Sequence, residues 1–190
     1  MEDKKFELLL NGIQDQLSSA RDHYAIFWQL SEGLKIYSVF NNYPIFFYNT
    51  LLAHDGVFIL SIHNITRYET KTANLPRLFK YIENNYDLLE MYTWEQIPGM
   101  KKMVRSHSKL IKRISDQRNK YSAHNEIGID AYKNLPTYSK EEGAKLLIDL
   151  DKILTEIKKG YDHTEWSIFN WIPHYNCQDL LKDLQRESSS

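Results

Sequence analysis

The stretch SKEEGAKLLIDLDKILTEIKKG, from Ser139 to Gly160, decides the fold. Ser139 and Glu142 have the spacing of a capping box, in which each side chain bonds to the backbone of the other residue at a helix start. The apolar residues recur at intervals of three and four, and Gly160 stands where a C-terminal cap is expected. These apolar residues are Leu146, Leu147, Leu150, Ile153, Leu154 and Ile157. The stretch therefore predicts a long amphipathic helix.

The composition extends the helical prediction to the whole chain. Of its 190 residues 42% are hydrophobic, with only seven Gly and five Pro. So few turn-forming residues fit long helices better than many short strands. The length suits one domain with its own core. We expect a single all-α domain over residues 1–190, an up-and-down bundle of about five to seven helices. An aromatic-rich C-terminal segment begins at about residue 161.

Several further segments have helical patterning. Pro44 follows an Asn-Asn-Tyr sequence that closes one segment, and proline is well suited to the first position of the next helix. A loop, TKTANLP, and a Pro-Gly turn at Pro98 and Gly99 separate later segments. Helices are therefore predicted at about 3–17, 20–41, 44–69, 75–85 and, as one basic helix, 100–122.

The N-terminal residues and the single cysteine bear on location. The chain starts charged and becomes amphipathic, which is not the pattern of a signal peptide. No window approaches the roughly 18 consecutive apolar residues of a membrane span. A single cysteine, Cys177, excludes an intramolecular disulfide. We expect a cytoplasmic protein with no membrane association.

Positive charge is concentrated in one segment of an otherwise balanced chain. Eight Lys or Arg residues lie between Lys101 and Lys120 against one acid, Asp116. The segment therefore has a net charge of +7, while the whole chain has −1. Such a segment indicates either an anionic partner, usually nucleic acid, or a solvated helix face offset by acidic neighbours.

The usual motifs of cofactor and metal chemistry do not occur in the sequence. The seven histidines form no i, i+4 pair and no Glu-x-x-His, the spacings that place two metal ligands on one helical face. Glycine-rich phosphate loops are also absent from the sequence. Five aromatic residues between Tyr161 and Tyr175 could stack on bases, but more often form a hydrophobic lid. We expect no cofactor and no metal site.

Arg118 breaks the pattern of the basic helix. At about 100° per residue it falls near the middle of the apolar arc, in line with Ile111, whereas most other cations lie on the opposite side. A guanidinium turned toward a core or interface must be paired or lie in a wet cleft. Arg118 could therefore form a buried salt bridge, and His124 could be a C-terminal residue favoured by the helix dipole. The alternative is that both belong to a catalytic site.

The sequence RNKYSAH, from Arg118 to His124, resembles the R-x(4–6)-H motif of HEPN-domain proteins, especially their abortive-infection branch. The motif lies late in a helical chain, before one more long amphipathic helix, and this placement agrees with the resemblance. The resemblance implies a helical bundle that dimerises, with the motifs of two protomers in one cleft. In active members it also implies metal-independent RNA cleavage of the toxin or phage-defence kind.

The resemblance gives each residue of the motif a role. Arg118 would bind phosphate in a fork, and His124 would act as general acid or base near neutral pH. Asn119 matches the polar position and would assist. The basic face would guide RNA through Lys109, Lys112, Arg113 and Lys120. An antitoxin or regulatory protein is a further expected partner.

Two other functions stay open at this point. One is a non-catalytic helical domain that binds a protein partner or RNA, since many HEPN-like domains are scaffolds. The other is a metal-dependent enzyme of a helical bundle, which the missing ligand spacings disfavour.

Overall fold

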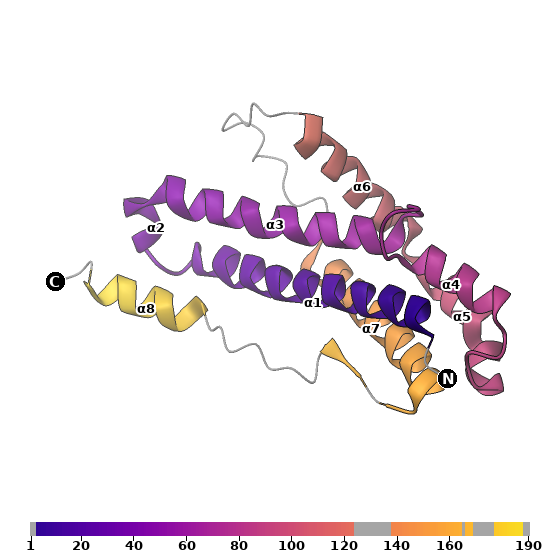
Figure 1. Cartoon of the computed structure of the whole chain (residues 1–190). Coiled ribbons are helices and arrows are strands. Elements are labelled where there is room, and N and C mark those ends of the chain that lie inside the picture. Colours follow the sequence, from indigo (N-terminus) through magenta and orange to yellow (C-terminus); the bar gives the residue numbers. More distant parts are fainter. Residues whose placement is uncertain (1–2, 124–137, 165, 169–176, 188–190) are drawn as a thin grey trace.

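Two long antiparallel helices, α1 (Lys4–Gly33) and α3 (Pro44–Thr66), lie side by side at the centre of the molecule (Figure 1). The computed structural model describes residues 3–123, 138–164, 166–168 and 177–187. Every regular element in these ranges is helical, which confirms the all-α prediction. The other helices are α2 (Val39–Asn42), α4 (Leu75–Asn84), α5 (Met91–Ser106), α6 (Ser108–Ala123), α7 (Lys140–Asp162) and α8 (Cys177–Glu187).

The first helix is longer than the sequence pattern predicted. Asp3 caps it by accepting hydrogen bonds from the backbone N–H groups of Lys5 and Phe6, and the helix then continues through Ser18 and Ser19. The predicted division of this region into helices at 3–17 and 20–41 is therefore wrong. The apolar face of α1 is buried along its whole length against α3 and α7, and that packing outweighs the weak helix propensity of two serines.

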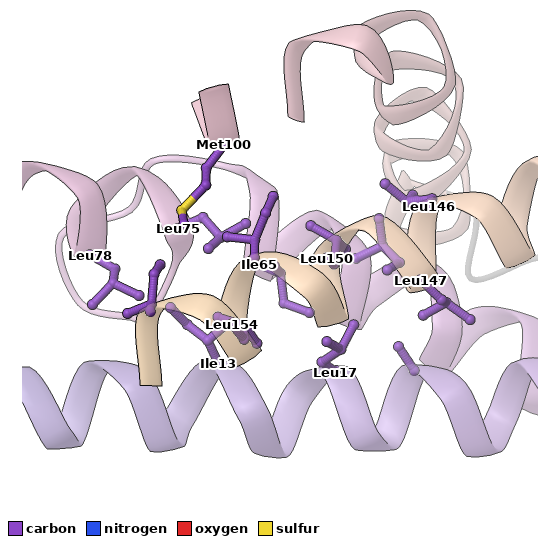
Figure 2. Packing of buried hydrophobic residues seen from close by; sticks show 14 of the residues in the cluster. Ile13, Leu17, Ile65, Leu75, Leu78, Met100, Leu146, Leu147, Leu150 and Leu154 are labelled. Atoms are coloured by element: carbon purple, nitrogen blue, oxygen red, sulfur yellow. The ribbon is translucent and has the colours of Figure 1, made fainter. Parts of the chain in front are cut away.

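The predicted helix after Ser139 is confirmed as α7. Both hydrogen bonds of the capping box are present, with Ser139 Oγ accepting from the N–H of Glu142 at 3.2 Å. All six of its predicted apolar residues are buried. In Figure 2, Leu150 and Leu154 of α7 lie in one cluster with Ile13 and Leu17 of α1. The core therefore sits between α7 and the α1–α3 pair.

Two predictions for the basic region are wrong. Pro98 and Gly99 do not form a turn, because α5 runs through them with both residues exposed. Ile97 and Met100 on the same helix are buried, and this packing against α7 overrides the helix-breaking tendency of Pro98. The predicted single helix over 100–122 is instead divided at His107 into α5 and α6. The His107 imidazole lies 2.8 Å from Asp149 of α7, which holds the break in place.

The predicted cap at Gly160 is also wrong. The helix α7 continues to Asp162 and ends at His163, which has the left-handed conformation with φ of 60°. Gly160 is buried inside the helix, where α7 approaches Thr93 of α5 closely. Its carbonyl accepts a hydrogen bond from the N–H of Glu90 at 3.0 Å. The glycine is therefore needed for a close approach of two helices.

The helix α3 has the length and apolar composition of a membrane span, although it is a weak candidate. It packs against α1 and α6 and carries three buried polar residues, Asp55, Ser61 and His63. A core helix of a soluble protein passes the same test of length and composition. In this fold 33% of the most apolar stretch of α3 is buried, against α1 and α6 above all.

The described part of the aromatic-rich segment packs on the bundle. Tyr161 stacks on Phe6 with a ring separation of 4.4 Å, and its hydroxyl donates to Glu7. Trp166 is partly buried against the main core. These two rings cover the core as a lid does, whereas Phe169, Trp171 and Tyr175 lie outside the described residues.

The close approach at Gly160 gives a test of the fold. A Cβ atom at this position would lie 2.6 Å from Thr93 Cβ, so Gly160→Ala is expected to reduce the free energy of unfolding by about 1–3 kcal/mol. Gly99→Ala is the matched control, because a Cβ there meets nothing within 4 Å. That variant is expected to gain up to about 1 kcal/mol from helix propensity. Urea unfolding of both variants measures the difference, and equal effects would contradict the packing assigned here.

Candidate functional site

Arg118 lies on the side of α6 that faces α3. Its neighbours on that side, Ile114 and Gln117, are buried, and Arg118 itself is half-buried. The break at His107 precedes both Ile111 and Arg118, so their predicted alignment on one face survives within α6. The Nε atom of Arg118 is buried and has no hydrogen-bond partner in the described part of the chain. No carboxylate of the described residues forms a salt bridge with it.

A buried carboxylate fixes α6 in this orientation. Asp55 of α3 is fully buried and accepts hydrogen bonds from Gln117 Nε2 at 3.0 Å and from the Tyr138 hydroxyl at 2.5 Å. A buried carboxylate requires such donors, because its desolvation is costly. The contact therefore sets which side of α6 faces α3, and Arg118 is the next residue along.

His63 of α3 contacts Ser115 of α6, which lies one turn before Arg118. Its Nδ1 lies 3.1 Å from Ser115 Oγ on α6, and its Nε2 lies 3.3 Å from Arg67 Nη1. Because a guanidinium only donates, we assign Nε2 as the acceptor. The proton is then on Nδ1, which donates to Ser115. His63 is thus a neutral imidazole held between a hydroxyl and a guanidinium.

The electrostatic surroundings keep His63 neutral. Burial lowers the pKa of His63, and the positive charges of Arg118 and Arg67 lower it further, while Glu69 opposes them. The charges of Arg118 and Arg67 therefore both act on His63, near the carboxyl end of α3, which packs against α6. His63 and Arg67 were not predicted as site residues. They lie about 50 residues before Arg118 in the sequence, and no motif joins them.

The other two predicted catalytic residues stand differently in the structure. Asn119 is exposed, and its Oδ1 accepts a long hydrogen bond of 3.3 Å from Arg118 Nη1. It is therefore placed to touch whatever Arg118 binds. His124 follows the last residue of α6 and lies outside the described residues.

The predicted RNA-binding residues gather at a groove on the other side of α6. The groove has a volume of about 610 Å³ and includes Lys109, Lys112 and Arg113 with Lys145 of α7. Arg113 pairs with Glu142 at 2.5 Å, which leaves three lysines as its excess charge. Lys145 was not predicted, because it lies on another helix. Lys120 is in α6, but its side chain is outside the described residues.

The groove and Arg118 lie on different sides of the helix. At about 100° per residue, Lys109 is 180° from Arg118 around the axis of α6. His107 also lines the groove and bonds to Asp149. The groove therefore belongs to the α6–α7 side, whereas Arg118 belongs to the α3–α6 side.

The described residues contain no cluster of three potential metal ligands. They do contain one close pair of imidazoles, His23 of α1 and His54 of α3, with their Nδ1 atoms 2.9 Å apart. Such a contact requires one ring to donate and the other to accept. Protonation of both rings would remove this hydrogen bond and add a repulsion.

Comparison of the chain with models of protein families, with curated proteins and with solved structures finds no significant match. The resemblance to HEPN-domain proteins therefore rests on the motif from Arg118 to His124 and on its placement in the chain. It stays a prediction.

The histidine pair predicts a pH-dependent stability. Burial lowers the pKa of both His23 and His54, and the nearby His23 lowers that of His54 further. The unfolded chain then binds more protons below its histidine pKa of about 6.5, so stability is lost as pH falls below that value. Urea midpoints are expected to fall from pH 7.5 to pH 5.5.

The double variant His23→Gln, His54→Gln tests this assignment. It is expected to lose less stability over the same pH interval, because two of the three described imidazoles with lowered pKa are gone. A pH dependence as steep as that of the unchanged protein would show that the pair is not its source.

Proposed function

We propose that this protein is a metal-independent endoribonuclease of the toxin or phage-defence kind, acting in the cytoplasm as a homodimer. One observation carries the proposal. Arg118 is a half-buried guanidinium without a carboxylate partner among the described residues, and its charge acts on His63 together with that of Arg67. A permanent cation in that position needs an anion, and the phosphate of RNA is the anion that the motif predicts.

The residues suit cleavage by the RNA's own 2′-hydroxyl. In that reaction the protein moves protons and stabilises the extra negative charge on the phosphate in the transition state. Arg118 supplies the stabilising charge, His124 transfers the proton, and Asn119 assists through its contact with Arg118. The products would carry a 2′,3′-cyclic phosphate.

The groove between α6 and α7 provides a path for the flanking RNA. Lys109, Lys112, Arg113 and Lys145 line it, and such residues bind the backbone without reading its sequence. In this proposal Lys120 continues the basic face toward the end of α6. The groove holds the flank, while the reacting phosphate lies on the Arg118 side.

An exposed apolar face on α3 supports the homodimer. Ile45, Phe46 and Leu60 are 74%, 64% and 45% exposed. They lie within about 100° of one another around the helix, and Arg67 lies within the same sector. A two-fold contact on this face would bury apolar surface, and an axis near Leu60, two turns before Arg67, would bring the two copies of the Arg118 site toward each other. An antitoxin or regulatory protein would be a second candidate for the same face.

The catalytic roles predict the behaviour of two variants. The purified protein is expected to cleave single-stranded RNA in EDTA, and Arg118→Ala and His124→Ala are each expected to reduce the rate at least a hundredfold. Circular dichroism and thermal melting check that the fold is kept. Lys35→Ala, an exposed cation between α1 and α2, is the control. Cleavage that persists in both variants would reject the assignment.

A substitution in the apolar face of α3 is expected to change the oligomeric state and the RNA cleavage activity together. Leu60→Glu places a charge in the apolar face and is expected to give a monomer by sedimentation, with cleavage lost although Arg118 is intact. Leu8→Glu is the control, because Leu8 of α1 is 74% exposed and lies on another helix. A Leu60→Glu protein that stays dimeric would place the interface elsewhere.

The rival function gives a different result in the same assays. A non-catalytic domain would bind RNA or a protein partner without producing cyclic phosphate ends. Binding without cleavage by the pure dimer, unchanged in His124→Ala, favours that function.

A further inference from the structure

Two arginines act on one imidazole, His63, one by direct contact and the other through its charge. Arg67, which follows the last residue of α3, reaches His63 Nε2 at 3.3 Å, and its backbone N–H donates to the His63 carbonyl at 3.0 Å. Ser115 of α6 contacts the other ring nitrogen, and Arg118 lies one turn further along the same side of α6. The contacts of His63 therefore join Arg67 directly, and through Ser115 the side of α6 that carries Arg118.

Like charges in this position require an explanation. Two cations repel each other, and although Arg67 is exposed, water is partly excluded around the half-buried Arg118 and the buried His63. Neither arginine forms a salt bridge with a described carboxylate. Glu69 acts on His63 at longer range but pairs with neither arginine among the described residues. The cluster therefore has an excess of positive charge.

The structural explanation accounts for one of the two charges. A cation at the carboxyl end of a helix is favoured by the helix dipole, which explains Arg67 at the end of α3. It does not explain Arg118, which is in the second half of α6 and turned toward α3. It also does not explain why Arg118 Nε is buried without a hydrogen-bond partner in the described residues.

We propose that Arg67 and Arg118 together bind one phosphodiester of the RNA backbone, and that His63 positions Arg67 for this contact. The assignment deepens the proposed nuclease, and it rests on that function for the identity of the ligand as RNA. Two guanidinium groups offer paired N–H donors in the planar geometry that phosphate oxygens accept. An anion between them also removes their repulsion.

His63 acts through Arg67 and does not touch the substrate. Its Nε2 accepts from Arg67, and its Nδ1–H donates to Ser115, so both ring nitrogens are engaged within the protein. His63 is only 5% exposed, so it is shielded from direct contact with RNA. His63 is therefore a positioning residue that orients Arg67 from α3 toward Arg118.

The test is a binding assay that does not depend on cleavage. The probe is a single-stranded 2′-O-methyl RNA 12-mer, which lacks the attacking hydroxyl, titrated in EDTA at several KCl concentrations by fluorescence anisotropy. Arg67→Ala and Arg118→Ala are each expected to weaken binding about tenfold and to lower the slope of log affinity against log salt by about 0.7, the value for one lost phosphate contact. The double variant is expected to lose less than the product of the two effects.

Two variants of His63 separate positioning from a general structural role. His63→Gln keeps a side-chain acceptor for Arg67 and is expected to bind nearly as well as the unchanged protein, whereas His63→Leu is expected to bind more weakly. In the Arg67→Ala background His63→Leu is expected to have no further effect, because its partner is gone. Lys35→Ala is the charge-matched control. Thermal melting confirms that each variant is folded.

The results separate this site from the proposed nuclease. If Arg67→Ala binds and cleaves as Lys35→Ala does, the two-arginine site is rejected while the nuclease stands. If the slopes change as expected but natural RNA is never cut, the phosphate site stands and the nuclease is rejected. Failure of the unchanged protein to bind the 12-mer, including the case in which it binds inorganic phosphate alone, overturns the RNA assignment.

Discussion

The buried carboxylate of Asp55 is the constraint on which the rest of the site depends. Gln117 and Tyr138 both donate to it, so one group on α3 holds α6 and the residue before the N-cap of α7. Burying an unpaired carboxylate costs free energy, so its two donors must have good hydrogen-bond angles as well as short distances. The rotation of α6 about its own axis is fixed by it, and that rotation decides which residues of α6 face α3.

The sequence predicted the fold best where local signals agreed with burial. The capping box and periodicity of α7 and the proline that opens α3 needed no knowledge of other helices. The errors fell where tertiary packing outweighed local preference. Thr93 against Gly160 and the buried neighbours of Pro98 are contacts between helices far apart in sequence, and no local pattern reports them.

Only one part of the candidate site, Arg118, could be predicted from the sequence. Arg118 is a charge out of phase with its own amphipathic helix, and a helical wheel detects it because the break at His107 lies before the residues that matter. His63 and Arg67 lack such a signal. A histidine in an apolar helix and an arginine at its end are each common in helical proteins. Their proposed role becomes visible only from the contact between α3 and α6. Lys145 was missed for the same reason, since α7 brings it to a groove begun by α6.

The spacing of residues along α6 determines which of them face α3 and which face α7. Lys109 and Arg118 lie on opposite sides of α6. The side with Lys109 forms the groove with α7, and the side with Arg118 faces α3. Insertion of one residue between Arg113 and Gln117 would leave the composition of α6 almost unchanged but rotate everything after it by about 100°. Gln117 would then lose Asp55, and Arg118 would turn away from the side of α6 that contacts His63. The information in this helix is carried by the spacing of its residues, and its charge content alone would not reproduce it.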